Sequence, residues 1–137
     1  MSWEPRPVPT VTPETAPYWE AAAEGRLLIR RCLDCELSFY YPRARCPDCL
    51  GDNVDWIEAD GTGTVYAHTS TTNVAAWPDD DLPLVLAYVE LDEGPRMLTA
   101  LSDCTGESVE IGTPVEVAFI PTASEDVSIP VFEPIDD

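Results

Sequence analysis

Hydrophobic and polar residues alternate with two different periods along this 137-residue chain. In residues 13–24, apolar side chains recur at helical spacing, with Thr12 as a possible N-cap before Pro13 and with Gly25 as the stop. This segment is therefore predicted to form one short amphipathic helix. From residue 60 onward the period changes to two, which is typical of strands that bury one face.

The period-two segments predict a series of short strands. We expect strands at Leu27–Arg31, Val54–Glu58, Val65–Ser70, Leu84–Leu91, Met97–Leu101, Val115–Ile120 and Ile129–Phe132. The segment Asp92–Pro95, with Gly94 where a positive φ is expected, predicts a hairpin between two of them. Five strands from residue 60 to the end, without a helical pattern among them, favour a closed five-stranded barrel of the oligonucleotide/oligosaccharide-binding (OB) type.

Four cysteines between the first two predicted strands restrict the chemistry most tightly. Cys32, Cys35, Cys46 and Cys49 form a C-x2-C-x10-C-x2-C frame. Two thiolates two residues apart can both point into one tetrahedral centre, so this spacing favours a single zinc ion. A filled shell of four thiolates leaves no position for water or substrate, which predicts a structural zinc. A rubredoxin-type iron centre and a pair of disulfides are the alternatives.

The patterns together predict a mainly β chain in three segments. Residues 1–25 would form an N-terminal arm and helix, residues 26–59 a rubredoxin-like zinc ribbon, and residues 60–137 the OB-fold. The first residues are polar and rich in proline, without the apolar run of a signal peptide, and no transmembrane stretch is predicted. We therefore expect a cytoplasmic protein, whose thiols stay reduced and free for a metal.

The charge of the chain is unusual in size and in distribution. There are 26 acidic residues against seven arginines, no lysine is present, and the formal net charge is -19. Such charge opposes compaction unless salt screens it, and the screening length falls to about 3 Å in molar salt. The composition favours adaptation to a salt-rich cytoplasm. An acidic face for a basic partner is the alternative, but it would concentrate the acids, which here are spread along the chain.

The sequence resembles the DUF35 family, in which a rubredoxin-like zinc ribbon precedes an OB-fold. The motifs that carry the resemblance are Tyr18-Trp19, Gly25-Arg26-Leu27, the two cysteine pairs, Tyr41-Pro42-Arg43, Gly63–Tyr66, Val89–Arg96, Ile111–Val115 and Pro130–Phe132. They extend over almost the whole chain, and taken together they are specific.

The resemblance implies a non-catalytic partner of thiolase-superfamily enzymes. Members of the family pair with thiolases, with hydroxymethylglutaryl-CoA (HMG-CoA) synthase or with thiolase-like aldolases, and help to form the channel for the CoA part of the substrate. Salt-adapted archaea use such proteins as the small subunit of acetoacetyl-CoA thiolase, in polyhydroxyalkanoate synthesis and in the mevalonate route. The expected reaction is then the condensation of two acetyl-CoA, or its reverse, with the chemistry in the large subunit of a hetero-oligomer.

The residues themselves predict no active site in this chain. His68, the only histidine, lies alone in a predicted strand, where a packed or surface role is commoner than that of a base. Cys104 lies beside Asp103 and near Glu107, whose charges would raise its pKa, so an inert thiol is expected. We therefore expect no catalytic residue and an accessory subunit rather than an enzyme.

Arginine is the only cation available to bind the phosphates of CoA. Four of the seven arginines flank the cysteine turns, at Arg30, Arg31, Arg43 and Arg45. Arg43 and Arg45, together with Tyr40 and Tyr41, are the candidates for a wall of the CoA channel, because planar guanidinium groups suit phosphates. Alternatively, the arginines only offset the charge of the thiolates, and the tyrosines pack against Trp19 or a partner.

A second hypothesis is a module that binds single-stranded nucleic acid, because zinc ribbons and OB barrels both serve that role. The charge of the chain argues against nucleic-acid binding, since seven arginines cannot form a cationic groove among 26 acidic residues. Trp77, beside Pro78 in a long loop, is predicted to be an exposed anchor for a partner protein. The segment Asp79–Asp81 that follows is predicted to be a solvated connection.

Overall fold

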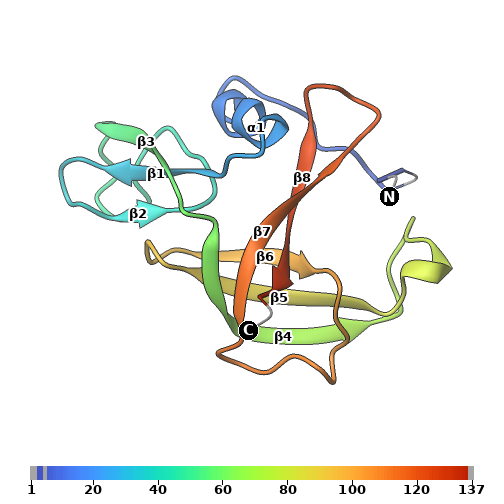
Figure 1. Ribbon diagram of the computed structural model, residues 1–137. Coiled ribbons are helices and arrows are strands. Elements are labelled where there is room, and N and C mark those ends of the chain that lie inside the picture. Colours follow the sequence, from blue (N-terminus) through green and yellow to red (C-terminus); the bar gives the residue numbers. More distant parts are fainter. Residues whose placement is uncertain (1–2, 5, 136–137) are drawn as a thin grey trace.

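The computed structural model of the protein describes residues 3–4 and 6–135. Its elements are α1 (Ala16–Ala23), β1 (Leu28–Cys32), β2 (Ser38–Phe39), β3 (Val54–Glu58), β4 (Thr62–Thr71), the 3-10 helix η1 (Asp79–Asp81), β5 (Leu84–Leu91), β6 (Arg96–Leu101), β7 (Pro114–Pro121) and β8 (Ser128–Pro134). One sheet has the order β2-β1-β3, and the other strands form a closed barrel with the order β4-β5-β6-β8-β7 (Figure 1). The predicted mainly β fold, with one helix, a ribbon and a five-stranded OB barrel, is confirmed.

Helix α1 begins later than predicted. Thr15, not Thr12, precedes the helix, and Pro17 lies in its first turn. Thr12 instead forms a turn with Thr15, whose backbone N–H donates to the Thr12 carbonyl at 3.0 Å. Proline is tolerated only near a helix start, so Pro17 places that start at Ala16. The predicted stop at Gly25 is confirmed, because its φ of +80° lies in the left-handed region.

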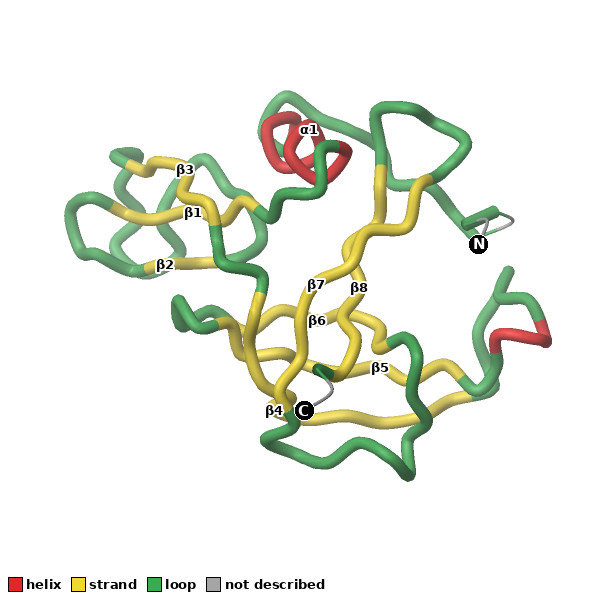
Figure 2. Tube along the Cα trace, in the orientation of Figure 1, coloured by secondary structure: helices red, strands yellow, loops and turns green. Residues whose placement is uncertain are grey.

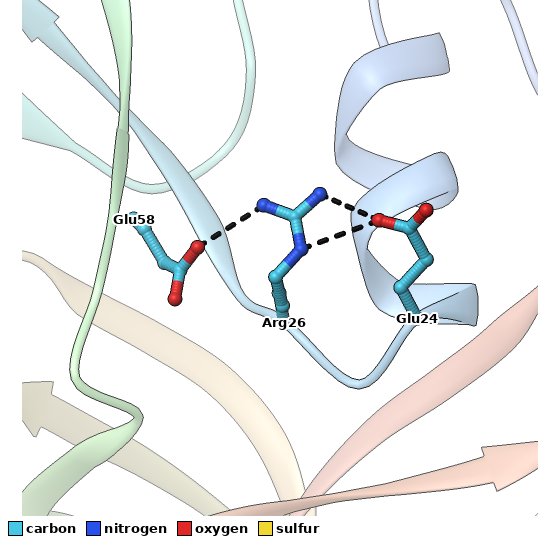
Figure 3. Close-up of polar contacts among 3 residues, drawn as sticks. All are labelled: Glu24, Arg26 and Glu58. Carbon is cyan, nitrogen blue, oxygen red and sulfur yellow. Dashed lines mark hydrogen bonds and ion pairs between the residues drawn. The ribbon is translucent and has the colours of Figure 1, made fainter.

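Helix α1 packs between the ribbon sheet and the barrel. It contacts β1 on one side and β7 and β8 on the other (Figure 1), and it buries Tyr18 and two alanines there. Arg26, directly after the helix, binds Glu24 at 2.6 Å and Glu58, at the end of β3, at 3.0 Å (Figure 3). All three side chains are exposed, so these ion pairs orient the link without contributing much stability.

The barrel closes through its last strand. β8 runs antiparallel to β7 along its whole length and meets β6 in a parallel pair at Leu101 and Phe132. In Figure 2, β7 and β8 run at a steep angle to β5 and β6, and β7 begins beside β4, with which it pairs. β4 pairs with both β5 and β7, and Gly63 is required where it crosses β5, because a Cβ there would lie 2.3 Å from the carbonyl oxygen of Glu90.

One apolar core joins the helix, the base of the ribbon and the barrel. Its buried members are Tyr18, Leu27, Ile29, Ala59, Val65, Val85, Ala87, Val89, Leu91, Met97, Leu101, Val109, Val115 and Phe132. The outer part of the ribbon has only a small cluster of its own, formed by Cys32, Phe39 and Cys46 with Val54 beside them. The ribbon therefore depends on something other than apolar burial to hold its cysteine turns.

Candidate metal centre and its surroundings

The four predicted cysteine ligands converge on one point. Cys32 and Cys35 lie at the end of β1 and in the turn after it, and Cys46 and Cys49 lie in the loop between β2 and β3. Their four sulfur atoms all lie within 4.8 Å of one another. Cys32 and Cys46 are buried, whereas Cys35 and Cys49 form the outer side of the centre. The two turns thus present a set of four thiols, each pair with one inner and one outer member.

The sulfur spacing fits a tetrahedral metal ion. The Sγ atoms of Cys32 and Cys49 are 3.6 Å apart, and those of Cys35 and Cys46 are 3.5 Å apart. Zinc–sulfur bonds of about 2.3 Å in a tetrahedron place the sulfurs about 3.8 Å apart, close to these distances. A disulfide needs sulfurs about 2.05 Å apart, so the alternative of two disulfides does not fit. The residues present therefore fit a metal ion held by four thiolates.

Backbone N–H groups of the two turns support the ligands. The N–H of Cys35 donates to Sγ of Cys32 at 3.5 Å, and the N–H of Asp48 donates to Sγ of Cys46 at 3.4 Å. The backbone N–H groups of Cys49 and Asp48 lower the pKa of the Cys46 thiol to about 7. A thiolate is the form that binds a metal, so this hydrogen bonding favours the ligand form of Cys46, whereas the neighbouring thiols raise the pKa of Cys35 and Cys49.

Arg30 is used within the ribbon itself. Its guanidinium carbon lies 4.1 Å from the ring centre of Trp56, and Nη2 donates to the carbonyl of Val54 at 3.0 Å. Removal from water lowers the pKa of this arginine. Arg30 therefore has a structural role on β1, which leaves the arginines of the cysteine loop as the better candidates for an outside ligand.

Arg43 and Arg45 both lie exposed in the loop that precedes Cys46. Arg45 donates to the carbonyl of Leu50 at 3.2 Å, and no described residue forms a hydrogen bond or an ion pair with Arg43. The N–H of Ala44, between them, donates to the Glu14 carboxylate at 3.2 Å, which ties the N-terminal arm to this loop. The two guanidinium groups therefore face solvent beside the metal centre.

The two candidate tyrosines differ in exposure. Tyr41 is 54% exposed, whereas Tyr40 is half-buried, with its ring 6.1 Å from that of Tyr18 and 5.9 Å from that of Tyr41. Tyr18 packs in turn on Trp19 at 4.9 Å, so Tyr40 extends the aromatic packing of the helix, as the second interpretation of these tyrosines expected. Burial raises the pKa of Tyr40. Tyr41 is thus the ring that is free to meet a ligand.

The residues weighed for catalysis lie away from the metal centre. His68 is in β4, half-buried, and no described carboxylate, thiol or hydroxyl lies in hydrogen-bonding contact with it. Cys104 lines a cavity of about 580 Å³ at the end of the barrel. Burial, and then the charge of Asp103, raise the pKa of its thiol. The structure therefore brings no nucleophile and base together at either residue.

The interpretation of Trp77 as an exposed anchor was wrong. Trp77 is half-buried, with its ring 5.5 Å from that of Trp3, and the guanidinium of Arg6 lies 4.6 Å from the Trp77 ring and 5.1 Å from the Trp3 ring. Arg6 is 4% exposed and forms an ion pair with Asp81. We call Trp3, Arg6, Trp77 and Asp81 the arm clasp, because they join the N-terminal arm to the loop between β4 and β5.

The arm clasp is not predictable from the sequence, because Arg6 and Asp81 lie 75 residues apart. The only local signal was a lone arginine between two prolines near a tryptophan.

Helix α1, with eight residues, is far too short to span a bilayer, and no other helix of the described chain has the length and hydrophobicity to do so.

Comparison with family models divides the chain at β3. Residues 19–55 match the model described as the rubredoxin-like zinc ribbon domain of ChsH2, and residues 56–119 match the model of the ChsH2 C-terminal OB-fold domain. The first match covers the four cysteines, which favours zinc over iron as their metal.

Two curated relatives differ greatly in length. The DUF35 domain-containing scaffold protein of Methanothermobacter thermautotrophicus is 32% identical over 108 residues, which are 77% of this chain and 81% of that protein. The probable enoyl-CoA hydratase alpha subunit of Thermomonospora curvata is 36% identical over 129 residues, which are 94% of this chain. This chain spans only 40% of the length of that second relative.

A solved structure is similar over nearly the full length. It is described as the Ltp2-ChsH2(DUF35) aldolase, and one of its chains superimposes with a TM-score of 0.77 and 35% sequence identity. The match covers 92% of this chain and 98% of that chain. Ribbon, helix and barrel thus occur together in a chain of closely similar extent.

Proposed function

This chain belongs to the DUF35 family, and we propose that it is a non-catalytic subunit of an enzyme complex that acts on CoA esters. The observation that carries the proposal is the match, over 92% of this chain, to a chain of the structure described as the Ltp2-ChsH2(DUF35) aldolase. That structure is described by two names, Ltp2 and ChsH2(DUF35), joined as one aldolase. The scaffold proteins among the curated relatives support the same role.

In this proposal a partner does the chemistry, because the described residues form no reaction centre of their own. Four thiolates around one metal ion leave no coordination position for a substrate. His68 and Cys104, the residues weighed as base and nucleophile, have no catalytic partner among the described residues. We therefore place nucleophile and base in the other subunit, with this chain supporting it.

We further propose that the partner is a thiolase-superfamily enzyme. An acetoacetyl-CoA thiolase or an HMG-CoA synthase would condense acetyl units, for polyhydroxyalkanoate synthesis or for the mevalonate route, in a cytoplasm rich in salt. The similar proteins are described as an aldolase and as an enoyl-CoA hydratase subunit, so an aldolase or a hydratase is the alternative partner. The acidic composition supports the salt-rich setting of this proposal.

In this role the loop before Cys46 would contribute one wall of the CoA channel. Arg43 and Arg45 offer two exposed guanidinium groups for the 3′-phosphate or the pyrophosphate, and Tyr41 offers an exposed ring beside them. Tyr40 would hold Tyr41 in place through its edge-to-face contact. The metal ion fixes this loop, because Cys46 and Cys49 end it.

The proposal is tested by purifying the tagged protein in molar salt and identifying what accompanies it by mass spectrometry. A CoA-ester enzyme in near-equal amount supports the accessory role, and the identity of that enzyme decides between thiolase, HMG-CoA synthase, aldolase and hydratase. Recovery of the chain alone from cells that contain such enzymes would contradict it.

The channel wall can be tested in the same complex. Arg43→Ala combined with Arg45→Ala is expected to raise KM for the CoA ester about tenfold with little change in kcat, because ground-state contacts to phosphate are lost. The same variant should discriminate less between CoA and 3′-dephospho-CoA. Arg26→Ala removes another exposed arginine, away from the cysteine loop, and serves as the control. An unchanged KM in the double variant would exclude these arginines from the channel.

A further inference from the structure

The outer face of β4, β5 and β6 carries exposed aromatic and aliphatic side chains. We call Tyr66, Tyr88, Glu90, Arg96 and Leu98 the tyrosine face. Tyr66 and Tyr88 are each 47% exposed, and Leu98 is 53% exposed. Inward-facing neighbours on the same strands, such as Val89 and Met97, are fully buried, so the alternation of the strands leaves these apolar groups on the outside.

The five residues form one continuous surface across three strands. Tyr88 of β5 lies directly opposite Leu98 of β6, and Glu90 lies opposite Arg96. The guanidinium of Arg96 reaches across β5 to lie 3.9 Å from the ring centre of Tyr66 on β4. On the way its Nε binds the Glu90 carboxylate at 3.1 Å. The arginine therefore links all three strands.

The tyrosine face is electrically neutral in a chain that is otherwise strongly acidic. Arg96 is the only arginine from residue 60 onward, and the one carboxylate of the face, that of Glu90, is paired with it. Acidic proteins repel each other wherever unpaired carboxylates meet. A macromolecule that binds these five residues meets no unpaired carboxylate among them.

The face also holds unused hydrogen-bond donors. The Glu90 carboxylate accepts only from Nε of Arg96, and no hydrogen bond among the described residues uses the two terminal amino groups of Arg96, whose guanidinium lies over the Tyr66 ring. The hydroxyl groups of Tyr66 and Tyr88 likewise have no hydrogen-bond partner in the described part of the chain. Exposed donors beside apolar rings complement a surface with aliphatic side chains and a carboxylate or carbonyl oxygen.

We propose that the tyrosine face is the docking surface for the catalytic subunit. The fitting surface of that subunit carries aliphatic side chains opposite Tyr88 and Leu98, and a carboxylate or backbone carbonyl opposite Arg96. Tyrosine and arginine are the residues that most often dominate the energy of protein interfaces. This inference rests on the proposed function, because it assigns a place to the partner that the proposed function requires.

A protein occupant fits this face better than a nucleic acid does. The outer strands of OB-folds commonly bind oligonucleotides, and Tyr66 and Tyr88 could stack bases. A strand of nucleic acid, however, needs a row of cations along its phosphates, and the barrel offers Arg96 alone. A neutral protein surface needs no such row.

The test measures the affinity between the purified chain and its co-purified partner in molar salt. Leu98→Asp is expected to weaken binding about thirtyfold or more, because it buries a charge in the centre of the interface. Val11→Asp is the control, since Val11 is also an exposed aliphatic residue, at 40%, and lies in the N-terminal arm, outside both the barrel and the ribbon. Both changes add the same charge at exposed positions, and zinc content with the unfolding midpoint verifies that both variants are folded.

The outcomes separate this inference from the proposed function. If the unchanged protein binds no CoA-ester enzyme, the proposed function fails before any variant is made. If it binds one and Leu98→Asp binds within about threefold of the unchanged protein, the docking surface lies elsewhere. Equal weakening by Val11→Asp would reveal a general effect of charge and would also overturn the inference. Binding of an oligo-dT 20-mer that is lost in Tyr88→Ala would assign the face to nucleic acid instead.

Discussion

At the scale of single residues, Cys46 connects the metal centre to the fold. It is one of the two buried ligands, and it also belongs to the small apolar cluster of the ribbon. Its replacement therefore removes a metal bond and an internal contact at once. Cys104, by contrast, lines a cavity at the far end of the barrel and touches no ligand.

We expect Cys46→Ala to abolish stoichiometric zinc binding and to lower the free energy of unfolding by about 3 kcal/mol or more, because three thiolates hold the ion less well and the ribbon depends on it. Zinc content by elemental mass spectrometry and chemical unfolding measure the two effects. Cys104→Ala should retain one zinc per chain. A Cys46→Ala protein with full zinc content would contradict the assignment of the ligands.

At the scale of elements, the ribbon and the barrel are stabilised by different means. The barrel strands enclose the main core, whereas the outer ribbon has only Phe39, Val54 and two cysteines to bury. Leu27 and Ile29 anchor the base of β1 in the main core. The cysteine turns beyond this base are held by the metal ion.

Metal removal should therefore act on part of the molecule. With a strong chelator, we expect amide protection to be lost in β2, β3 and the cysteine turns, while β5 and β6 keep most of theirs. Hydrogen exchange followed by mass spectrometry resolves these segments, and added zinc should restore the loss. Equal loss of protection in the barrel strands would mean that the two modules unfold as one unit.

The arm clasp is a second element-scale feature, because it fixes a long loop that has little other support. Arg6→Ala removes the ion pair with Asp81 and both aromatic contacts, so we expect about 2 kcal/mol of destabilisation. Cleavage between residues 72 and 83 by limited proteolysis should become faster. Arg26→Ala, which breaks only exposed ion pairs, should leave cleavage unchanged. An unaltered cleavage rate in Arg6→Ala would indicate that the loop is ordered without the arm.

Elements with a strong local signal were predictable from the sequence, and those that depend on distant contacts were not. The strands Val54–Glu58 and Leu84–Leu91 have the predicted bounds, because apolar runs and turn residues delimit them. Strand β2 has only two residues, and it forms by pairing with Arg30 and Arg31 of β1, so nothing local predicts it. The helix start was predicted too early because the chain has two possible starts, Thr12-Pro13 and Ala16-Pro17. Their local sequences do not distinguish them, and the helix begins at the second.

The same distinction applies to the candidate site. Cysteine spacing identifies the ligands, since it reflects the local geometry of two turns. Spacing cannot reveal that Arg30 stacks on Trp56 or that Tyr40 packs on Tyr18, because these pairs are joined only by the fold. The neutral tyrosine face escaped notice for the same reason, as its residues come from three strands.

At the scale of the whole molecule, repulsion between carboxylates opposes the compact state that the core and the metal ion stabilise. The formal net charge is -19, and the ion pairs given for the described residues are few and mostly exposed. Carboxylates without a cation nearby repel one another, and added salt screens this repulsion.

We therefore expect the unfolding midpoint to rise steeply between 0.1 and 1 M potassium chloride, because screening acts mainly over this range. Thermal unfolding followed by circular dichroism measures the rise. Sucrose at matched osmolality supplies a control without ions, and its effect should be smaller. A midpoint that does not change with chloride concentration would refute a dominant role for self-repulsion.

The closure of the barrel by β8 sets an order for events during synthesis. Phe132 must reach Leu101 before the wall is complete, so the barrel waits until residues near 134 have left the ribosome. The four cysteines emerge about eighty residues earlier, and their turns are local enough to capture zinc at once. The nascent chain thus carries a metal-bound ribbon while the barrel sheet is still open. The stage most exposed to misassembly is the interval between zinc capture and barrel closure.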